Sequence, residues 1–157
     1  MEELPLSGKL QQEIRRSQPF ENPEVEAFLS LERTAEVLQG QLAKLLKPAG
    51  VSPAQYNVLR ILRGAGADGL PCGEIGERMI QRDPDITRLI DRMEQRGWVA
   101  RIRSSADRRV VRVRILEPAL EILSQLDEPV LDLHRRQFAQ LNGGSVQNLI
   151  DLLEKLR

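Results

Sequence analysis

The sequence predicts a winged helix-turn-helix fold, mainly helical with a small β-hairpin as the wing and with longer helices towards both ends. Apolar residues of the central segment recur with a helical period up to Gly97 and then with a period of two. A short turn, residues 81–84, separates two of the central helices. Residues 88–114 contain nine Arg against three Asp or Glu, although the whole chain has a net charge of zero. Such a basic block is typical of a nucleic-acid binder, although a solvated charged face produces the same count.

The composition excludes several other classes of protein. With 157 residues, of which 41% are hydrophobic, the chain suits one compact domain with helical extensions. No apolar run approaches the ~18 residues of a membrane span, and the first residues lack the apolar segment of a secretory signal. One Cys and one His exclude a disulfide framework and a Cys-cluster or multi-histidine metal site. We therefore expect a cytoplasmic protein without a membrane partner, a metal or a cofactor.

Residues 1–21 lack clear periodicity and are expected to form an arm or a frayed helix. Asn22 and Pro23 then start a helix as its N-cap and first helical residue, and residues 48–50 end it. Its apolar residues follow at spacings of three and four, the heptad seam of a helix that packs on another helix. They are Phe28, Leu31, Ala35, Leu38, Leu42 and Leu45.

The winged domain is expected over residues 51–116. Its first helix begins at Ser52 with a capping box and Pro53, and glycines at 64, 66 and 69 break the chain after it. The apolar stripe of this helix is Val58, Leu59 and Leu62. A short helix over residues 72–80 follows, and Gly76 at its middle indicates a close crossing by another helix.

The next helix is predicted from Pro84 to Arg96, with Asp83 as its N-cap and Gly97 ending it. Its apolar face consists of Ile86, Leu89, Ile90 and Met93. Two alternating runs around a polar tip then predict a hairpin with one buried face and one arginine face. In the first run Trp98, Ala100 and Ile102 alternate with Val99, Arg101 and Arg103, and in the second Val111, Val113 and Ile115 alternate with Arg112 and Arg114.

Residues 117–157 are predicted to form two helices. The first begins at Glu117, and Pro129 should kink or split it. Its apolar stripe is Leu120, Leu123, Leu126, Val130 and Leu131. Ser145 is expected to cap the last helix, whose stripe is Leu149, Leu152, Leu153 and Leu156. A single winged domain cannot cover both terminal stripes, so residues 22–50 and 117–157 are expected to be dimerisation helices.

Two segments of the winged domain carry a recognisable pattern. Residues 86–99 read I-T-R-L-I-D-R-M-E-Q-R-G-W-V, and Asp107, Arg108 and Arg109 precede the alternating strand 111–115. Both resemble signatures of the MarR family of bacterial transcriptional regulators, in which the first reads T-R-L-[VI]-D-R-L-E-x-x-G-[LW]-[VI]. The resemblance covers about residues 25–156. It implies a homodimer on a palindromic operator in double-stranded DNA, acting as a repressor that a small-molecule effector releases.

The resemblance also implies roles for individual residues. Arg109 matches the wing arginine that enters the minor groove, and Asp107 matches the acid that pairs with it and fixes its direction. Thr87 and Arg88 match positions of the recognition helix that face DNA. The full predicted DNA surface is Thr87, Arg88, Arg92, Asp107, Arg108, Arg109 and Arg112. Within it Arg108 is expected near phosphate, and Arg112 is expected to attract DNA at long range or to be merely solvated.

The start of the recognition helix departs from the family pattern, which more often has small hydroxylated residues than Asp83-Pro84-Asp85. Asp85 either accepts a hydrogen bond from a cytosine amine or lies at a helix start that the dipole favours, and we prefer the second. Cys72 is expected to be a half-buried filler, because redox-sensing members use a cysteine nearer the N-terminus. His134 is expected to be structural or exposed.

The resemblance also implies an effector site between the dimer helices and the winged domain, and we expect it near Tyr56, Leu59 and Arg60. Two other function classes remain open. One is a winged-helix protein-interaction module without DNA binding, which the presence of Asp107 and Arg109 disfavours. The other is an enzyme, for which the sequence contains no nucleophile–base pair, phosphate loop or ligand cluster, so that no catalytic residue is expected.

Overall fold

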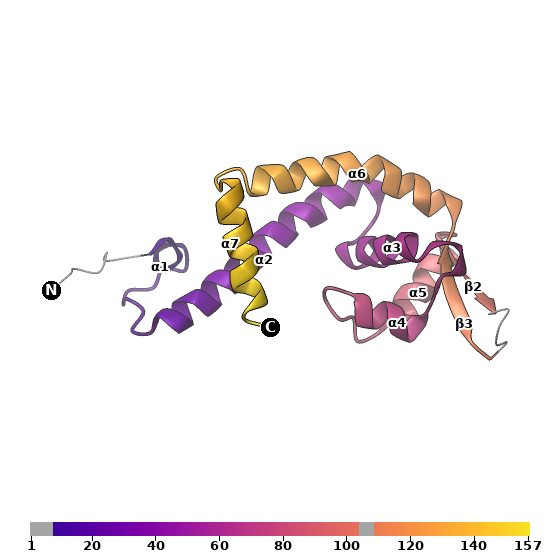
Figure 1. Cartoon of the computed structure of the whole chain (residues 1–157), viewed down its shortest axis with the longest axis horizontal. Coiled ribbons are helices and arrows are strands. Elements are labelled where there is room, and N and C mark those ends of the chain that lie inside the picture. The colour runs from indigo at the N-terminus through magenta and orange to yellow at the C-terminus, as the bar shows by residue number, and fades with distance from the viewer. Residues whose placement is uncertain (1–7, 104–108) are drawn as a thin grey trace. The chain divides into compact units, whose positions relative to one another are not determined.

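The structure is a computed structural model that describes residues 8–103 and 109–157 (Figure 1). Helices dominate, and a small antiparallel sheet accompanies them, which confirms the predicted fold class. The elements in chain order are α1 (Lys9–Glu13), α2 (Pro23–Leu46), η1 (Lys47–Ala49), α3 (Pro53–Ala65), η2 (Gly66–Asp68), β1 (Leu70–Pro71), α4 (Cys72–Arg78), α5 (Ile86–Gln95), β2 (Val99–Arg103), β3 (Val111–Ile115), α6 (Glu117–Gln137) and α7 (Gly143–Glu154). Within the described ranges, every helix is too short or too polar to span a membrane.

The chain divides into two units, one up to residue 41 and one from residue 42 to its end. In the first unit α1 lies inside the segment that was expected to be an arm or a frayed helix, and its Leu10 is buried. The first part of the apolar stripe predicted on α2 is uncovered, because 60% of Phe28 and 40% of Leu31 are exposed to solvent, whereas Leu42 and Leu45 pack against the core of the second unit. Within the first unit, Phe28 and Leu31 therefore lack the packing partner that a heptad seam requires.

The start of α3 confirms the predicted capping box. The Ser52 hydroxyl accepts a hydrogen bond from the Gln55 backbone N–H at 3.2 Å, and the Gln55 side chain accepts one from the Ser52 N–H at 3.0 Å. Gly50, just before it, has φ +68°, a left-handed conformation that glycine adopts without a steric cost. Local sequence alone is sufficient to specify this helix start.

The core of the second unit lies between α3, α4, α5, α6 and the sheet. Its largest fully buried side chains are Leu46, Val58, Leu59, Leu62, Ile75, Ile90, Met93, Val99, Val113 and Leu123. Each buried Leu or Ile contributes about 1.5–3 kcal/mol relative to exposure. A Cβ on Gly76 would meet the Ile86 side chain at 3.8 Å, which is an ordinary contact. Helices α4 and α5 therefore pack at this position, but their packing does not require a glycine there.

A charged pair joins α3 to α6. Two nitrogens of the Arg63 guanidinium donate to the two carboxylate oxygens of Asp127, each at 2.8 Å. The hydrogen bond to Asp127 raises the pKa of Arg63, and the bond from Arg63 lowers the pKa of Asp127. Both groups therefore stay charged over the whole physiological range of pH.

Helix α5 begins two residues later than predicted. Its N-cap is Asp85, whose carboxylate accepts from the Arg88 N–H at 3.4 Å, so the assignment of Asp83 as N-cap is wrong. Asp83 instead accepts from the Asp85 N–H at 2.8 Å and orders the turn before the helix. Two acids at this spacing both suit a cap, and Asp85 takes the position because its carboxylate meets the Arg88 N–H three residues later.

The far end of α5 is attached to the segment that follows α2. The Arg96 guanidinium donates to the Gly50 carbonyl at 2.7 Å and lies 3.7 Å from the centroid of the Trp98 ring. Gly97 ends the helix with φ +69°, as predicted. The Trp98 side chain is only 5% exposed.

The sheet has three strands in the order β1-β3-β2, and the sequence did not predict β1, which has only two residues. β1 follows Gly69, which has φ +60° and approaches β3 closely. A Cβ at this position would lie 2.2 Å from the carbonyl oxygen of Val113. Only glycine therefore permits β1 to pair with β3.

The predicted faces of the hairpin are wrong for its first strand. Val99 pairs with Ile115 and Arg101 pairs with Val113, and residues paired across two strands point to the same side. Arg101 therefore shares a face with the buried Val113, whereas Ile102 pairs with Arg112 on the other face. Alternation shows which residues of a strand share a face, but it does not show which face is buried when arginine side chains have partners on the core side.

Helix α6 runs unbroken through Pro129, so the predicted split is wrong. Gln125 and Pro129 are both exposed, so the carbonyl that loses its helical partner faces water. The buried residues of α6 are Ala119, Leu123, Leu126, Val130 and Leu133. Leu131, which was predicted to belong to the stripe, is instead 42% exposed.

Helix α7 is capped by Asn142, not by Ser145. The Asn142 side-chain oxygen accepts from the Ser145 N–H at 2.8 Å, so Ser145 occupies the third helical position. None of the residues of α7 is buried, and 59% of Leu152 and 71% of Leu156 are exposed. Leu149 and Leu153 are half-buried, so the predicted apolar stripe of this helix is partly uncovered within the second unit.

Candidate nucleic-acid interface

Helices α4 and α5 form a helix-turn-helix whose turn is attached to α3. The Asn57 side-chain oxygen accepts a hydrogen bond from the backbone N–H of Ile80 at 2.9 Å. Met79, just before it, is buried, whereas 88% of the Ile80 side chain is exposed. The turn is therefore held in place by its backbone and presents an aliphatic side chain to solvent.

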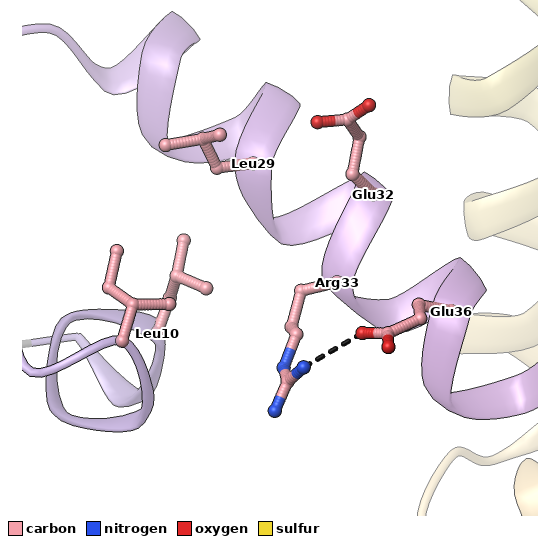
Figure 2. A pocket seen from close by; sticks show the side chains of 6 residues that line it. Leu10, Leu29, Glu32, Arg33 and Glu36 are labelled. Atoms are coloured by element: carbon pink, nitrogen blue, oxygen red, sulfur yellow. Dashed lines mark hydrogen bonds and ion pairs between the residues drawn. The ribbon is translucent and has the colours of Figure 1, made fainter. Parts of the chain in front are cut away.

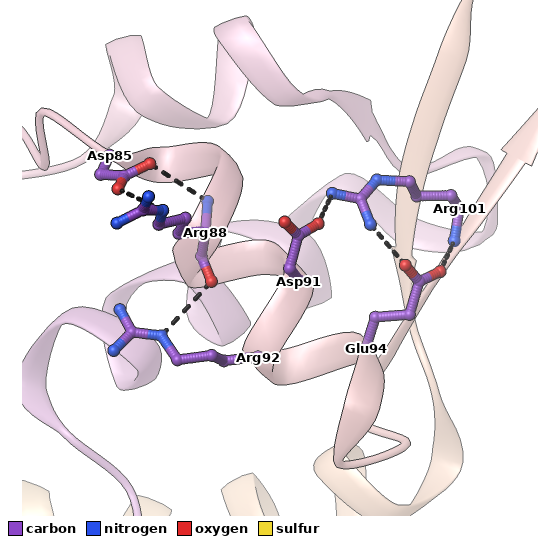
Figure 3. Close-up of polar contacts among 6 residues, drawn as sticks. All are labelled: Asp85, Arg88, Asp91, Arg92, Glu94 and Arg101. Atoms are coloured by element: carbon purple, nitrogen blue, oxygen red, sulfur yellow. Dashed lines mark hydrogen bonds and ion pairs between the residues drawn. The ribbon is translucent and has the colours of Figure 1, made fainter.

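The outer face of α5 carries the predicted contact residues. Leu89, Ile90 and Met93 are buried against the core, so Thr87, Arg88 and Arg92 are on the exposed side. The Arg88 side chain is 81% exposed and lies 3.3 Å from the N-cap carboxylate of Asp85. Arg92 donates from Nε to the Arg88 carbonyl at 3.3 Å (Figure 3).

Next to these contact residues on α5, one arginine of β2 binds two acids of the helix (Figure 3). Arg101 Nη2 lies 2.5 Å from Asp91 Oδ1, and Arg101 Nη1 donates to Glu94 Oε2. The Arg101 backbone N–H also donates to Glu94 Oε1 at 2.9 Å. Burial opposes the charge of Arg101, but the hydrogen bonds to Asp91 and Glu94 outweigh it and raise its pKa.

The described arginines of the wing fall into two situations. Arg109 and Arg114 are exposed. The guanidinium of Arg112 donates to the carbonyls of Asp68 at 2.9 Å and Gly69 at 2.8 Å, so it holds the segment before β1 against the hairpin. The predicted contact residues Asp107 and Arg108 lie outside the described residues.

The residues expected to line an effector site lie together on α3. Tyr56 is 7% exposed and its hydroxyl accepts from Arg60 Nη1 at 3.0 Å, whereas Leu59 is fully buried in the core. A cavity of about 420 Å³ lies elsewhere, in the unit that ends at residue 41 (Figure 2). It is lined by Leu10, Ile14, Leu29, Glu32, Arg33 and Glu36.

The lone Cys72 and His134 lie where they were expected. Cys72 is half-buried at the first position of α4, packs against the core, and follows an N-cap, Pro71, that makes no side-chain hydrogen bond. His134 is exposed, with Nδ1 2.9 Å from the Gln137 side-chain oxygen. Residues 8–103 and 109–157 contain no group of three or more His, Cys, Asp or Glu side chains that would hold a metal ion.

Sequence reasoning missed the contacts that two arginines of this region make within the chain: those of Arg101 with two acids and those of Arg112 with backbone carbonyls. A signal for the first was present, since Asp91 and Glu94 are acids three residues apart within a basic block. An acid within a basic block usually has a nearby cation as its partner, because otherwise it would weaken the positive potential of the block. For Arg112 no local signal exists, because its partners are backbone carbonyls more than forty residues away.

Comparisons with known proteins agree with this architecture. A family model described as the MarR family matches residues 51–111. The HTH-type transcriptional repressor MdtR of Bacillus subtilis (strain 168) is 36% identical over 83 residues, which cover 53% of this chain and 52% of MdtR. The HTH-type transcriptional repressor IacR of Pseudomonas putida is 32% identical over 113 residues, or 72% of this chain and 66% of IacR. The chain thus spans about half of the first relative and about two thirds of the second.

Solved structures extend the similarity to most of the chain. A MarR transcription factor from Planctomyces limnophilus is 38% identical, with a TM-score of 0.65, over 87% of this chain and 98% of that one. A mutant MarR from E. coli complexed with operator DNA is 25% identical, with a TM-score of 0.78, over 88% and 99% of the two chains. The similarity therefore includes the terminal helices as well as the helix-turn-helix.

Proposed function

The chain belongs to the MarR family, and from this premise we propose that it is a sequence-specific regulator of transcription that binds double-stranded DNA. One observation carries the proposal. The helix-turn-helix presents Thr87, Arg88 and Arg92 on the exposed face of α5, while the opposite face is buried in the core. A rigidly packed helix with an exposed arginine face fits the major groove, where arginine reads guanine and contacts phosphate.

We assign the wing residues as follows. Arg109 enters the minor groove, where the negative potential is deepest at A·T-rich steps. Asp107 fixes the direction of Arg109, and Arg108 contacts phosphate. Arg112 adds positive charge near DNA while its guanidinium holds the segment before β1.

The functional molecule is proposed to be a homodimer on a palindromic operator. The apolar stripes of α2 and α7 both contain exposed side chains, and a second copy provides the surface to cover them. Two recognition helices then lie ~34 Å apart, one turn of DNA. We place the terminal helices, residues 22–50 and 117–157, in this interface and residues 51–116 in the DNA-binding domain.

The protein is further proposed to act in the cytoplasm as a repressor that a small molecule releases. Two relatives, MdtR and IacR, are described as transcriptional repressors. Tyr56 and Arg60 remain the proposed polar contacts of the effector, with Leu59 behind them in the core. No catalytic reaction is assigned to the chain.

A selection experiment tests the function. The wild-type chain is incubated with a randomised duplex library, and the enriched duplex is titrated by fluorescence anisotropy against a scrambled one. Arg88→Ala and Arg109→Ala should each weaken binding to the enriched duplex by about 1–3 kcal/mol. Lys9→Ala, which removes the same charge from the exposed side of α1 and lies outside both the proposed dimer interface and the DNA-binding domain, is the control.

The wing offers a second and sharper test. Asp107→Ala removes a negative charge and should nevertheless weaken binding, because Asp107 is assigned to orient Arg109. The double variant of Asp107 and Arg109 should be little worse than Arg109→Ala alone, since the two residues act as one unit. If no duplex is enriched, the chain is instead a protein-interaction module, and the proposed function is wrong.

A further inference from the structure

We propose that Arg101 is a positioning residue that sets the angle of α5 relative to the wing strands, and thereby the sequence selectivity of DNA binding, through Asp91 and Glu94. This inference rests on the proposed function. Arg101 belongs to β2 and both acids belong to α5, so three hydrogen bonds join one wing residue to the recognition helix (Figure 3).

The geometry of the acids restrains rotation of the helix. Asp91 and Glu94 are three residues apart, so they lie on one side of α5 on adjacent turns. One guanidinium binds both, with Nη2 on Asp91 and Nη1 on Glu94. Two attachment points along the helix oppose both a turn about its axis and a slide along it, which a single attachment would not.

The contact residues move with these attachment points. Thr87 lies four residues before Asp91 and Arg88 lies three residues before it, so both stand one turn away on the same or the adjoining side. The buried side chains of α5 hold it on the core, but apolar contacts carry little directional information. Charge-assisted hydrogen bonds are directional, so Arg101 supplies the angular restraint that the core lacks.

The position of β2 in the sheet strengthens the link. β2 is an edge strand, because the order is β1-β3-β2. One backbone N–H of this edge, that of Arg101, donates to Glu94 at 2.9 Å instead of to another strand. The carboxylate of Glu94 thus binds both the backbone and the guanidinium of one residue, which couples the strand itself to the helix.

Arg101 also neutralises two acids near the proposed phosphate contacts, and this second effect has to be separated from positioning. Loss of neutralisation weakens binding to every duplex, because phosphate repulsion is independent of sequence. Loss of positioning weakens binding mainly to the preferred duplex, because only base contacts depend on the angle of α5. The informative quantity is therefore the selectivity ratio, the Kd for a scrambled duplex divided by the Kd for the enriched duplex.

The chain contains a matched control for Arg101. Arg63 also binds a carboxylate with two nitrogens of its guanidinium. The exposed fractions of the two arginine side chains are similar, 30% for Arg63 and 29% for Arg101. Those of their partners are similar too, 43% for Asp127 and 46% for Asp91. Arg63→Gln therefore removes the same charge and a similar ion pair, but between α3 and α6. Any inactive fraction lowers the apparent affinity for both duplexes equally and leaves the ratio unchanged.

The experiment measures the selectivity ratio by fluorescence anisotropy for the full-length chain, with thermal unfolding followed by circular dichroism. Arg101→Gln should lower the ratio about tenfold, the lower end of what one base contact contributes. Arg101→Lys restores the charge without the fork, so it should recover affinity for the scrambled duplex but not the ratio. Arg63→Gln should lower thermal stability and leave the ratio as in the wild type.

A variant with Asp91→Asn, Glu94→Gln and Arg101→Gln together removes both acids along with the arginine, so a low ratio in this variant supports positioning. A ratio restored to the wild-type value would overturn the inference, as would an unchanged ratio in a folded Arg101→Gln variant. If Arg101→Gln does not fold, the variant Glu94→Gln replaces it in the experiment, because its side chain still offers an acceptor to the Arg101 N–H. Glu94→Gln should give a selectivity ratio between those of the wild type and a non-selective chain. A wild-type ratio in Glu94→Gln would overturn the inference. Failure of the wild-type chain to enrich any duplex would instead refute the proposed function itself.

Discussion

Replacing Gly69 by alanine should be among the most destabilising single changes in the chain. The residue has φ +60° and ψ −165°, a region of backbone conformation that is essentially restricted to glycine. An added Cβ would lie 2.2 Å from the Val113 carbonyl oxygen, 2.7 Å from its carbon and 3.1 Å from the Arg114 Cα. All three are backbone atoms, so no rotation of a side chain relieves the overlap.

Two contributions determine the magnitude. The backbone conformation alone costs an alanine about 1–3 kcal/mol. Relief of the clash separates β1 from β3, which exposes part of Leu70 and removes the carbonyls that bind Arg112. Full exposure of a buried Leu costs about 1.5–3 kcal/mol. With Leu70 partly exposed, we therefore expect the free energy of unfolding to fall by about 2–5 kcal/mol, which is large for a single substitution.

Gly66→Ala separates the two contributions. Gly66 has φ +71° and ψ −157°, close to the values of Gly69, but a Cβ there would meet no atom within 4 Å. It should therefore lose only the conformational part, about 1–3 kcal/mol. Urea unfolding followed by circular dichroism gives both values, at one fixed protein concentration because dimerisation contributes to stability. Equal losses for the two variants would show that β3 yields to the added methyl, and the argument from close approach would be refuted.

Three further predictions concern charge, sulfur and assembly. Arg63 lowers the pKa of Asp127, so the ion pair contributes its full stabilisation above about pH 4, the ordinary pKa of Asp, and loses it as the pH falls below that value. The difference in urea midpoint between wild type and Asp127→Asn should therefore shrink as the pH falls below about 4. A difference independent of pH would contradict the assignment. Cys72→Ser should leave DNA affinity and its response to peroxide unchanged in anisotropy titrations, because the chain contains no second cysteine to form a disulfide with Cys72. If peroxide releases the wild-type chain from DNA but not the Cys72→Ser variant, Cys72 is a sensor. Deletion of residues 145–157 should yield monomer or aggregate in light scattering, because it removes the exposed leucines of α7; a soluble dimer would exclude this helix from the interface.

Local signals in the sequence predicted much of the fold. The capping box at Ser52 and the left-handed Gly97 depend on neighbouring residues alone, and both lie as expected. Helix starts were misplaced where several residues suit the same role. Asp83 and Asp85 both suit an N-cap, as do Asn142 and Ser145, and residue type alone does not select between the two candidates.

Features that depend on distant residues were not predictable from one sequence. β1 exists because Gly69 allows it to meet β3, more than forty residues later in the chain. Arg101 was assigned to an exposed arginine face because alternation shows which residues share a side but not which side is buried. The exposed residues of α5 were easier to predict, since the buried face of an amphipathic helix defines its exposed face.

The indole of Trp98 makes the chain an optical probe of its own recognition helix. Trp98 is the single tryptophan of the sequence, so all indole emission comes from one site. That site lies immediately after α5, where the ring is enclosed and the Arg96 guanidinium covers its face. A shift of α5 that moved Arg96 away from the Gly50 carbonyl would change the polarity and the charge next to the ring. Unlabelled protein thus reports on the position of α5 during titrations and rapid mixing, without a dye near the DNA.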